Sequence, residues 1–274
     1  MSGPEDDRHP IMAFHSSRRL RQLAAASATL TLAPTARRLE NVLHEVTVDG
    51  GLGFCHAAVP ELLPIGYHGP LVVAFDSNVL IDLQEYGGSL LNGEDLGVDE
   101  GYEEQLLALG SILDVWMLRD IRFIVTPRSR TDAKRLSKRF LATRGPAIDA
   151  LAESLAFQYG DWSVAAPSDR KVAPIGSVTG IPDGADLDLL LEAQSVGAHA
   201  FLTRDEKVLT SAVLTGPALR ILRPTEVADE LVLSGSKLLE GGLCLTEHCP
   251  YREFSLPLPD LGKWRGVMSL FEEA

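Results

Sequence analysis

The chain has 274 residues, of which 45% are hydrophobic and 23% are charged, and it contains three cysteines. This composition is typical of a folded globular protein with one large domain and additions, and it excludes a disordered chain. The few cysteines give no disulfide framework and suit a reducing cytoplasm. The formal net charge of −13 argues against unspecific coating of nucleic acid. No run of about 18 apolar residues is found, so no membrane contact is expected.

The N-terminal part of the chain is expected to lie outside the main domain. Residues 1–16 are polar and contain glycine and proline, which predicts disorder. Residues 17–70 combine amphipathic stretches with a Gly/Pro-rich passage, and we interpret them as a helical extension and linker. The main domain is expected over 71–233, followed by a C-terminal tail over 234–274.

From residue 71 onward, short apolar runs alternate with longer amphipathic ones, which is typical of strand–helix repeats with a mainly parallel sheet. Strands are predicted at LVVAF, IRFIV, AFLT and LRIL. Helices are predicted at SNVLIDLQEY, EEQLLALGSILDVWML, the basic segment 129–141, AIDALAESLAFQYG, ADLDLLLEAQSVG and TEVADELVL. Loops are expected at GGSLLNGEDLGVDEG and DWSVAAPSDRKVAPIGSVTGIPDG, which are rich in glycine and polar residues.

Four aspartates lie near the predicted strand ends. Asp76 follows LVVAF and Asp205 follows AFLT, while Asp132 lies just beyond IRFIV and Asp186 lies at the start of ADLDLLLEA. Ligands bind outside the carboxyl ends of parallel strands, so we expect these side chains to share one site. Carboxylates this close stay ionised together only if a cation neutralises them. Oxygen ligands suit Mg²⁺ or Mn²⁺, which can activate water for attack on a phosphodiester.

A purely structural role stays open at each of these positions. Asp76 could cap the helix that follows it. Asp132 and Asp186 suit the first turn of a helix, where a negative charge interacts favourably with the helix dipole. Asp205 could be a solvated turn residue. Their joint placement at one edge of the sheet is what favours a metal site.

Three segments resemble the PIN-domain ribonuclease family, and together they span most of residues 71–233. FDSNVLIDL is similar to the opening strand of that family, its Asp-(Ser/Thr)-(Asn/Ser) motif and the apolar helix that follows. ADLDLLLEAQSVGAHAFLTRDEKVL resembles an Asp, a small-residue helix, Gly-Ala, an apolar strand and Thr-x-Asp. LRILRPTEVADEL resembles the final strand, proline and helix. The resemblance implies a three-layer α/β fold with a mainly parallel central sheet, and metal-dependent endoribonuclease activity.

The resemblance also implies roles for individual residues. Asp76, Asp186 and Asp205 would be catalytic acids that hold Mg²⁺ or Mn²⁺. Asn78 and Thr203 would be polar supports that hydrogen-bond the carboxylates or water.

Three further acids have a less direct correspondence. Asp132 stands near the place where the family generally has a Glu, and we include it as the fourth catalytic acid. Asp188 would be an outer ligand or a cap. Asp183 competes with Asp186 if the register of that helix is shifted. The segment 84–120 is longer than in the compact toxin members of the family, which leaves the substrate and biological role open.

A basic segment follows the strand IRFIV in this acidic chain, and it is where we expect the RNA backbone to bind. Two of its pairs have i, i+4 spacing, so they align on one face of a helix. A solvated helix face is the alternative. The segment has no interleaved aromatic residues, which favours recognition of RNA shape or backbone. The predicted RNA-binding residues are Arg128, Arg130, Lys134, Arg135, Lys138 and Arg139.

Rival interpretations stay open. One is a catalytically weak PIN-like module that binds RNA or regulates. Another is a phosphatase with Asp76 as nucleophile, although the related motif has a second Asp where this chain has Asn78. Cys244, His248 and Cys249 could bind zinc or be ordinary buried residues. Besides RNA, the partners left open are an antitoxin of a toxin–antitoxin pair, another regulatory protein and a second copy of the chain.

Overall fold

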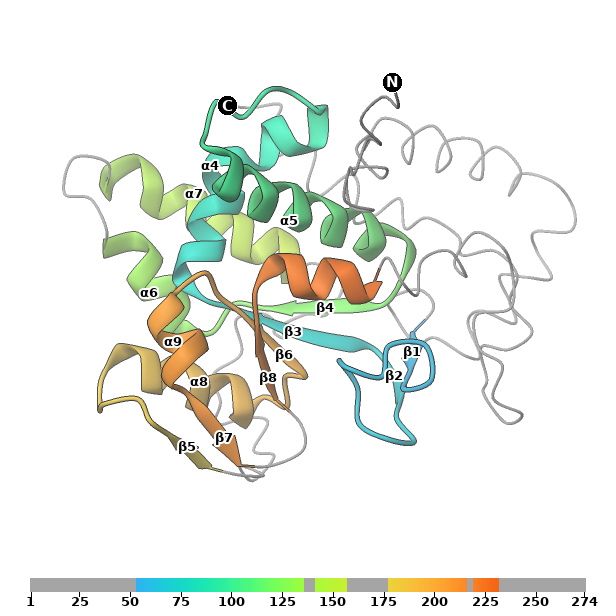
Figure 1. The fold of residues 1–274 in the computed structure, drawn as a ribbon. Helices are drawn as coiled ribbons and strands as arrows, with labels where there is room; N and C mark the ends of the chain where they lie inside the picture. The colour runs from blue at the N-terminus through green and yellow to red at the C-terminus, as the bar shows by residue number, and fades with distance from the viewer. Residues whose placement is uncertain (1–52, 136–140, 157–176, 216–218, 232–274) are drawn as a thin grey trace, which may run out of the picture.

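The computed structural model describes residues 53–135, 141–156, 177–215 and 219–231 (Figure 1). Several predictions lie outside these residues. They are the disorder of 1–16, most of the helical extension 17–70, the whole tail 234–274 with its cysteine and histidine residues, and most of the long polar loop before the helix ADLDLLLEAQSVG.

Within the described ranges, four strands form a parallel sheet in the order β4-β3-β6-β8. The strands are β3 (Leu71–Phe75), β4 (Ile121–Ile124), β6 (Ala200–Leu202) and β8 (Arg220–Leu222). They coincide with the four predicted apolar runs, so the parallel sheet is confirmed. β3 has β4 on one side and β6 on the other, so the chain adds strands in opposite directions from β3. Such a reversal places a crevice at the carboxyl ends of β3 and β6.

Helices precede or follow each strand of this sheet. They are α4 (Ser77–Asn92), α5 (Glu100–Leu118), α6 (Pro127–Arg135), α7 (Leu141–Ala156), α8 (Ala185–Ser195), the short α9 (Glu206–Ser211) and a helix over 224–231. α4 continues through 87–92, which was predicted to be part of a loop. Leu90 is 6% exposed, so its packing favours the helix over the flexibility of the two glycines before it. Gly93, at φ 67°, then ends the helix in the left-handed conformation.

Side chains of β3 alternate between two hydrophobic clusters, as the geometry of a strand requires. Leu71, Val73 and Phe75 pack with residues of α4, α5, α7 and 224–231. Val72 and Ala74 pack with residues of α8 and α9. Figure 1 shows α5 and 224–231 on one side of the sheet and α8 on the other. The mixed α/β class is confirmed, and the arrangement is compatible with three layers.

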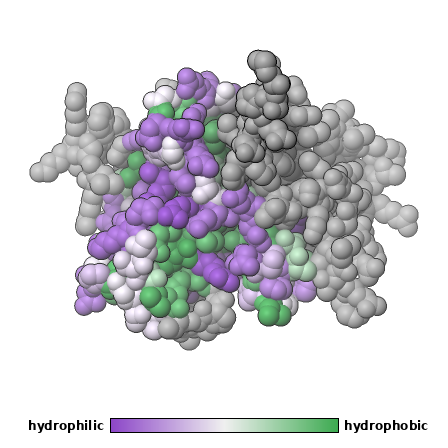
Figure 2. Space-filling model, in the orientation of Figure 1, coloured by the Kyte–Doolittle hydropathy of each residue, from purple (hydrophilic) through white to green (hydrophobic). Residues whose placement is uncertain are grey.

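The surface of the described residues is mixed in character. Figure 2 shows hydrophilic residues across the side of α4 and α5, and hydrophobic residues gathered below them. The large apolar side chains that are exposed include Ile65, Leu191 and Val213, which lie far apart in the sequence. In this part of the chain, no helix combines the length and apolar character needed to cross a membrane.

Residues before the sheet also belong to the hydrophobic core. β1 (Phe54–Cys55) and β2 (His68–Gly69) form an antiparallel pair that was not predicted, like the pair β5 (Ser177–Thr179) and β7 (Val213–Thr215). Phe54 is fully buried, and the guanidinium of Arg119 lies 4.3 Å from its ring centroid. The last part of the predicted linker is therefore packed structure. Its apolar residues are spaced irregularly among prolines and glycines, so hydrophobic periodicity did not predict this packing.

Replacing Phe54 tests whether this segment is part of the folded domain. We expect Phe54→Ala to lower the free energy of unfolding by about 3–5 kcal/mol, since it removes a buried aromatic ring and leaves a cavity. Urea unfolding measures the change. Ile65→Ala is the matched control in the same segment, because Ile65 is 89% exposed and its loss should cost at most about 0.5 kcal/mol. Similar small effects for both substitutions would contradict the packing.

Candidate functional site

The candidate site lies at the carboxyl ends of β3 and β6, where the strand order reverses. Asp76 directly follows β3, and residues 203–205 directly follow β6. The backbone N–H of Asp76 donates to the carbonyl of Leu202 at 2.9 Å, which joins the two strand ends. The crevice that such a reversal creates is the usual ligand site of parallel sheets. The structure therefore brings two of the predicted acids, Asp76 and Asp205, to this crevice.

Asp76 is 6% exposed, and its carboxylate accepts hydrogen bonds on both oxygens. Oδ1 accepts from the backbone N–H of Ser77 at 2.6 Å and from its hydroxyl at 3.2 Å. Oδ2 accepts from Nδ2 of Asn78 at 2.7 Å and from Oγ1 of Thr203 at 2.5 Å. Asp76 is also the N-cap of α4, so the structural role left open for it is confirmed. Asn78 and Thr203 contact the carboxylate as the resemblance implied.

Asp205 is tied to the same network through Thr203. Its backbone N–H donates to Oγ1 of Thr203 at 3.0 Å. Its Oδ1 caps α9 by accepting from the N–H groups of Lys207 at 2.8 Å and Val208 at 3.4 Å. Among the described residues, Oδ2 of Asp205 has no hydrogen-bond donor. Within the described ranges, one oxygen of Asp205 is therefore open to a ligand.

The charge of Asp76 is unfavourable where it stands. Burial raises the pKa of its carboxyl above the ordinary value, hydrogen bonds from Thr203 and Ser77 oppose that rise, and the negative charge of Asp205 adds to it. The hydrogen bonds favour the ionised form but do not fully offset burial. A cation bound between the two carboxylates would lower both the cost of burying the charge of Asp76 and its repulsion by Asp205.

The other predicted acids are paired with cations of the protein. Asp186 lies in the first turn of α8, and its Oδ2 is 3.8 Å from Nζ of Lys207. The guanidinium of Arg128 joins Asp132, at 2.7 Å, to Asp188, at 3.8 Å. Within the described part of the chain, Asp132 makes no contact with Asp76.

The competitor residue Asp183 is exposed and precedes α8. The predicted helical register, with Asp186 in the first turn, is confirmed.

The described basic residues of α6 are also paired with acids. Arg130 and Lys134 both form ion pairs with Asp149 of α7, and Arg130 lies 3.7 Å from Glu153. Burial raises the pKa of the Asp149 carboxyl, but hydrogen bonds from Arg130 and Lys134 outweigh burial and bring that pKa below its ordinary value. These cations therefore hold α6 against α7. The side chain of Arg135 and the residues 136–140, which include two of the predicted RNA-binding residues, lie outside the described structure.

A buried network that the sequence did not reveal holds the loop after β6. Asp82 is 1% exposed and accepts from Arg204 at 2.6 and 2.8 Å and from the hydroxyl of Tyr102 at 2.6 Å. Burial raises the pKa of Asp82, and the hydrogen bonds from Arg204 and Tyr102 oppose this. Since Arg204 lies between Thr203 and Asp205, the network fixes both neighbours. A single charge within the apolar run VLIDL was the one signal that could have pointed to it.

The donor set matches a hard divalent cation in its chemistry. Among the described residues, no three histidine, cysteine, aspartate or glutamate side chains are grouped closely enough to form a complete metal cage. Mg²⁺ usually binds one or two carboxylates and completes its shell with waters and substrate phosphates. Asp76 and Asp205 fit that pattern, because each carries negative charge into the same crevice.

The pH dependence of stability tests the environment of Asp76. In EDTA, we expect the free energy of unfolding of the wild-type protein, relative to Asp76→Asn, to fall as the pH rises above 3.8, the ordinary value for an aspartate. The folded pKa is the higher one, so the unfolded state binds fewer protons in this range and ionisation favours unfolding. The amide does not titrate, so the difference isolates Asp76. Urea unfolding of both proteins over a pH series measures it, and a difference that rises with pH would contradict the burial argument.

Comparison with known proteins gives no family assignment. No protein-family model and no curated protein matches the sequence, and no solved structure matches the fold.

Proposed function

We propose that this chain is a metal-dependent endoribonuclease with a PIN-like, three-layer α/β fold. The observation that carries the proposal is the joint placement of Asp76 and Asp205 at the crevice between β3 and β6, linked through the hydroxyl of Thr203. The two carboxylates repel each other, and a divalent cation would stabilise them by neutralising their charge. The resemblance of FDSNVLIDL and of the Thr-x-Asp segment to the PIN family supports the same reading.

In this proposal, Asp76 and Asp205 hold Mg²⁺ or Mn²⁺ at the crevice. When bound, the cation supplies the Lewis acidity that activates water and stabilises the leaving oxygen of a phosphodiester. Asn78 and Thr203 orient the Asp76 carboxylate by donating to Oδ2. Asp186 would join the site as a further acid when Lys207, its present partner, is drawn to a phosphate.

The neighbouring helix α6 supplies the cations for the RNA backbone. Arg128 now neutralises Asp132 and Asp188, and a phosphate of the substrate would compete for the same guanidinium. Asp132 would be the fourth acid, next to the phosphate that Arg128 binds. Arg130 and Lys134 extend the positive charge along α6, although Asp149 partly offsets it.

A second candidate is a catalytically weak module that binds RNA or is held silent by a regulatory protein such as an antitoxin. It is favoured by the ion pairs that already neutralise Asp132, Asp186 and Asp188. An Asp76 nucleophile of the phosphatase type fits less well. Its two oxygens accept from four donors, which lowers their reactivity toward phosphorus.

A cleavage assay tests the proposed activity. We expect purified protein with Mn²⁺ to cut single-stranded or structured RNA, and both Asp76→Asn and Asp205→Asn to lower the rate by about 100-fold or more, since each removes charge stabilisation at the reacting phosphate. Gel analysis of end-labelled RNA measures the rates, and chelation by EDTA should abolish cleavage.

The matched control is Asp183→Asn, which changes an exposed aspartate close to α8 that lies outside the crevice network. The Asp183→Asn protein should cleave RNA at the wild-type rate. Equal cleavage by the wild-type protein and Asp76→Asn would show that a contaminating nuclease cuts the RNA, and it would contradict the proposal. Metal-dependent RNA binding without cleavage would favour the second candidate.

A further inference from the structure

Arg204 is held by one face of α4, both at its backbone and at its side chain. Its backbone N–H donates to Oδ1 of Asn78 at 3.3 Å. Its guanidinium donates to the two carboxylate oxygens of Asp82 at 2.6 and 2.8 Å. Asn78 and Asp82 are four residues apart, so they lie one turn apart on the same side of the helix. The loop after β6 is therefore fastened to α4 at two points.

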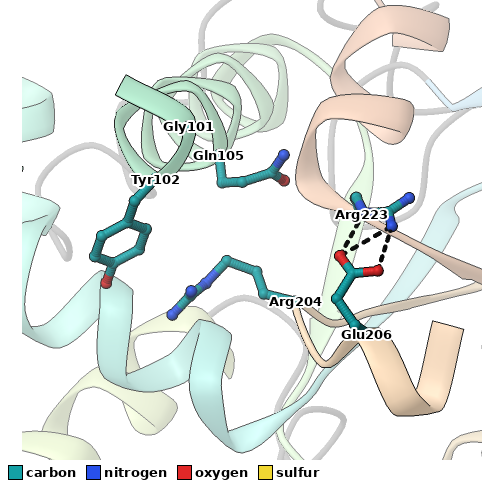
Figure 3. A pocket seen from close by; sticks show the side chains of 6 residues that line it. All are labelled: Gly101, Tyr102, Gln105, Arg204, Glu206 and Arg223. Atoms are coloured by element: carbon teal, nitrogen blue, oxygen red, sulfur yellow. Dashed lines mark hydrogen bonds and ion pairs between the residues drawn. The ribbon is translucent and has the colours of Figure 1, made fainter. Parts of the chain in front are cut away.

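α5 supports the same ion pair through Tyr102. The hydroxyl of Tyr102 donates to Oδ1 of Asp82 at 2.6 Å, and its ring lies 4.4 Å from the guanidinium of Arg204. Tyr102 is itself fixed, because its N–H donates to Asp99, the N-cap of α5, and its ring meets the ring of Tyr86 edge-on. Figure 3 shows Tyr102 and Arg204 reaching toward each other from α5 and from the loop after β6. Two helices and this loop thus meet at one buried carboxylate.

A pocket of about 270 Å³ borders Arg204 and Tyr102 (Figure 3). The side chain of Arg204 is 28% exposed, so packing does not enclose it on the side of the pocket. Its guanidinium would have other positions open to it without Asp82 and Tyr102. These two contacts therefore determine where Arg204 lies. The lining residues of the pocket are Gly101, Tyr102, Gln105, Arg204, Glu206 and Arg223.

Arg204 connects to both acids of the candidate metal site. Thr203, which precedes it, donates to Oδ2 of Asp76, and Asp205 follows it directly. Asn78, which accepts from the N–H of Arg204, donates to the same oxygen of Asp76 at 2.7 Å. Consecutive Cα atoms are about 3.8 Å apart, so a shift of Arg204 also shifts its two neighbours in the chain. The geometry of both acids therefore depends on the position of Arg204.

We propose that Asp82 and Tyr102 are positioning residues of the cation site, which act through Arg204 without contacting the cation. The inference rests on the proposed function and adds to it two residues that determine metal affinity. Groups that orient metal ligands from outside the coordination shell typically change metal affinity by about 10–100-fold when they are replaced. The inference also gives α5, which supplies none of the proposed metal ligands, a part in the site.

The affinity for Mn²⁺ separates positioning from the effect of charge alone. Asp82→Asn removes a negative charge and Arg204→Gln removes a positive one, so charge alone would weaken Mn²⁺ binding in the first and strengthen it in the second. Positioning instead predicts binding about 10-fold or more weaker in each full-length variant, as measured by isothermal titration calorimetry. The double variant should bind no more weakly than the weaker single variant, because both substitutions remove the same contact.

Tyr102→Phe tests the same contact without any change of charge. It keeps the ring beside Arg204 and loses the hydrogen bond to Asp82, so we expect Mn²⁺ binding to weaken by about 3-fold. Thermal melting verifies that each variant is folded. If Asp82→Asn does not fold, Tyr102→Phe and Arg204→Gln still decide the outcome.

Asp120→Asn is the matched control at the opposite edge of the sheet. Asp120 is 3% exposed and is also paired with an arginine, since it accepts from Arg122 in two hydrogen bonds of 3.2 Å. It directly precedes β4, so it lies at the amino ends of the parallel strands, away from the cation site. Asp120→Asn should therefore lower the melting temperature and leave the Mn²⁺ affinity unchanged.

Wild-type Mn²⁺ affinity in Asp82→Asn or Tyr102→Phe would overturn the positioning role. Stronger binding by Arg204→Gln, or an equal loss in Asp120→Asn, would overturn it as well. The nuclease proposal is judged separately. Mn²⁺ binding with the expected losses by a protein that never cuts RNA would refute the nuclease alone, and Mn²⁺-dependent cutting without these losses would refute the positioning role alone. No Mn²⁺ binding by the wild-type chain would overturn both.

Discussion

A carboxylate buried at the end of a central strand is the constraint on which the candidate site depends. Asp76 is almost fully enclosed, and its ionised form is supported by donors from Ser77, Asn78 and Thr203. Those donors do not offset the loss of solvation, and the charge of Asp205 makes the balance worse. A fold that only needed a helix cap could have used a more exposed aspartate, and the energetic cost of burying this one supports the cation proposed above.

Asp205, the second acid of the candidate site, is positioned by a different interaction. Residues 203–205 form a short loop that would be free to move if it were held by its backbone alone. Arg204 anchors it, because its guanidinium binds the buried Asp82 on α4 and lies over Tyr102 on α5. One residue thus fixes Thr203 and Asp205 on one side and forms a wall of the neighbouring pocket on the other. The position of Asp205 and one wall of the pocket therefore both depend on the same ion pair between Arg204 and Asp82.

Local patterns in the sequence were sufficient to predict the parallel sheet and the places of Asp76 and Asp205 just beyond two of its strands. LVVAF and AFL are apolar because β3 and β6 are buried, and each strand ends at a polar residue, Asp76 or Thr203, that is itself buried. The packing of Phe54 and the continuation of α4 through Leu90 could not be predicted in this way. Both depend on contacts with distant parts of the chain, and neither has a periodic signal.

The chemistry of the site was predictable only in part for the same reason. The sequence predicted that Asp76, Asp132, Asp186 and Asp205 would share one cation, and the structure brings the first and the last of these to neighbouring strand ends. The structure pairs Asp132 and Asp186 with Arg128 and Lys207 instead. Which cation each acid meets depends on the packing of α6, α8 and α9, and the spacing of residues along the chain does not specify it.

The central claim is that Asp76 and Asp205 together hold one divalent cation. Titration of the protein with Mn²⁺, followed by electron paramagnetic resonance of the free ion, tests it without any assumption about the substrate. The account predicts a single bound Mn²⁺ per wild-type chain and loss of that binding in Asp76→Asn and in Asp205→Asn, with both variants folded. Mn²⁺ binding that is unchanged in either variant, or no binding by the wild-type chain, would contradict it.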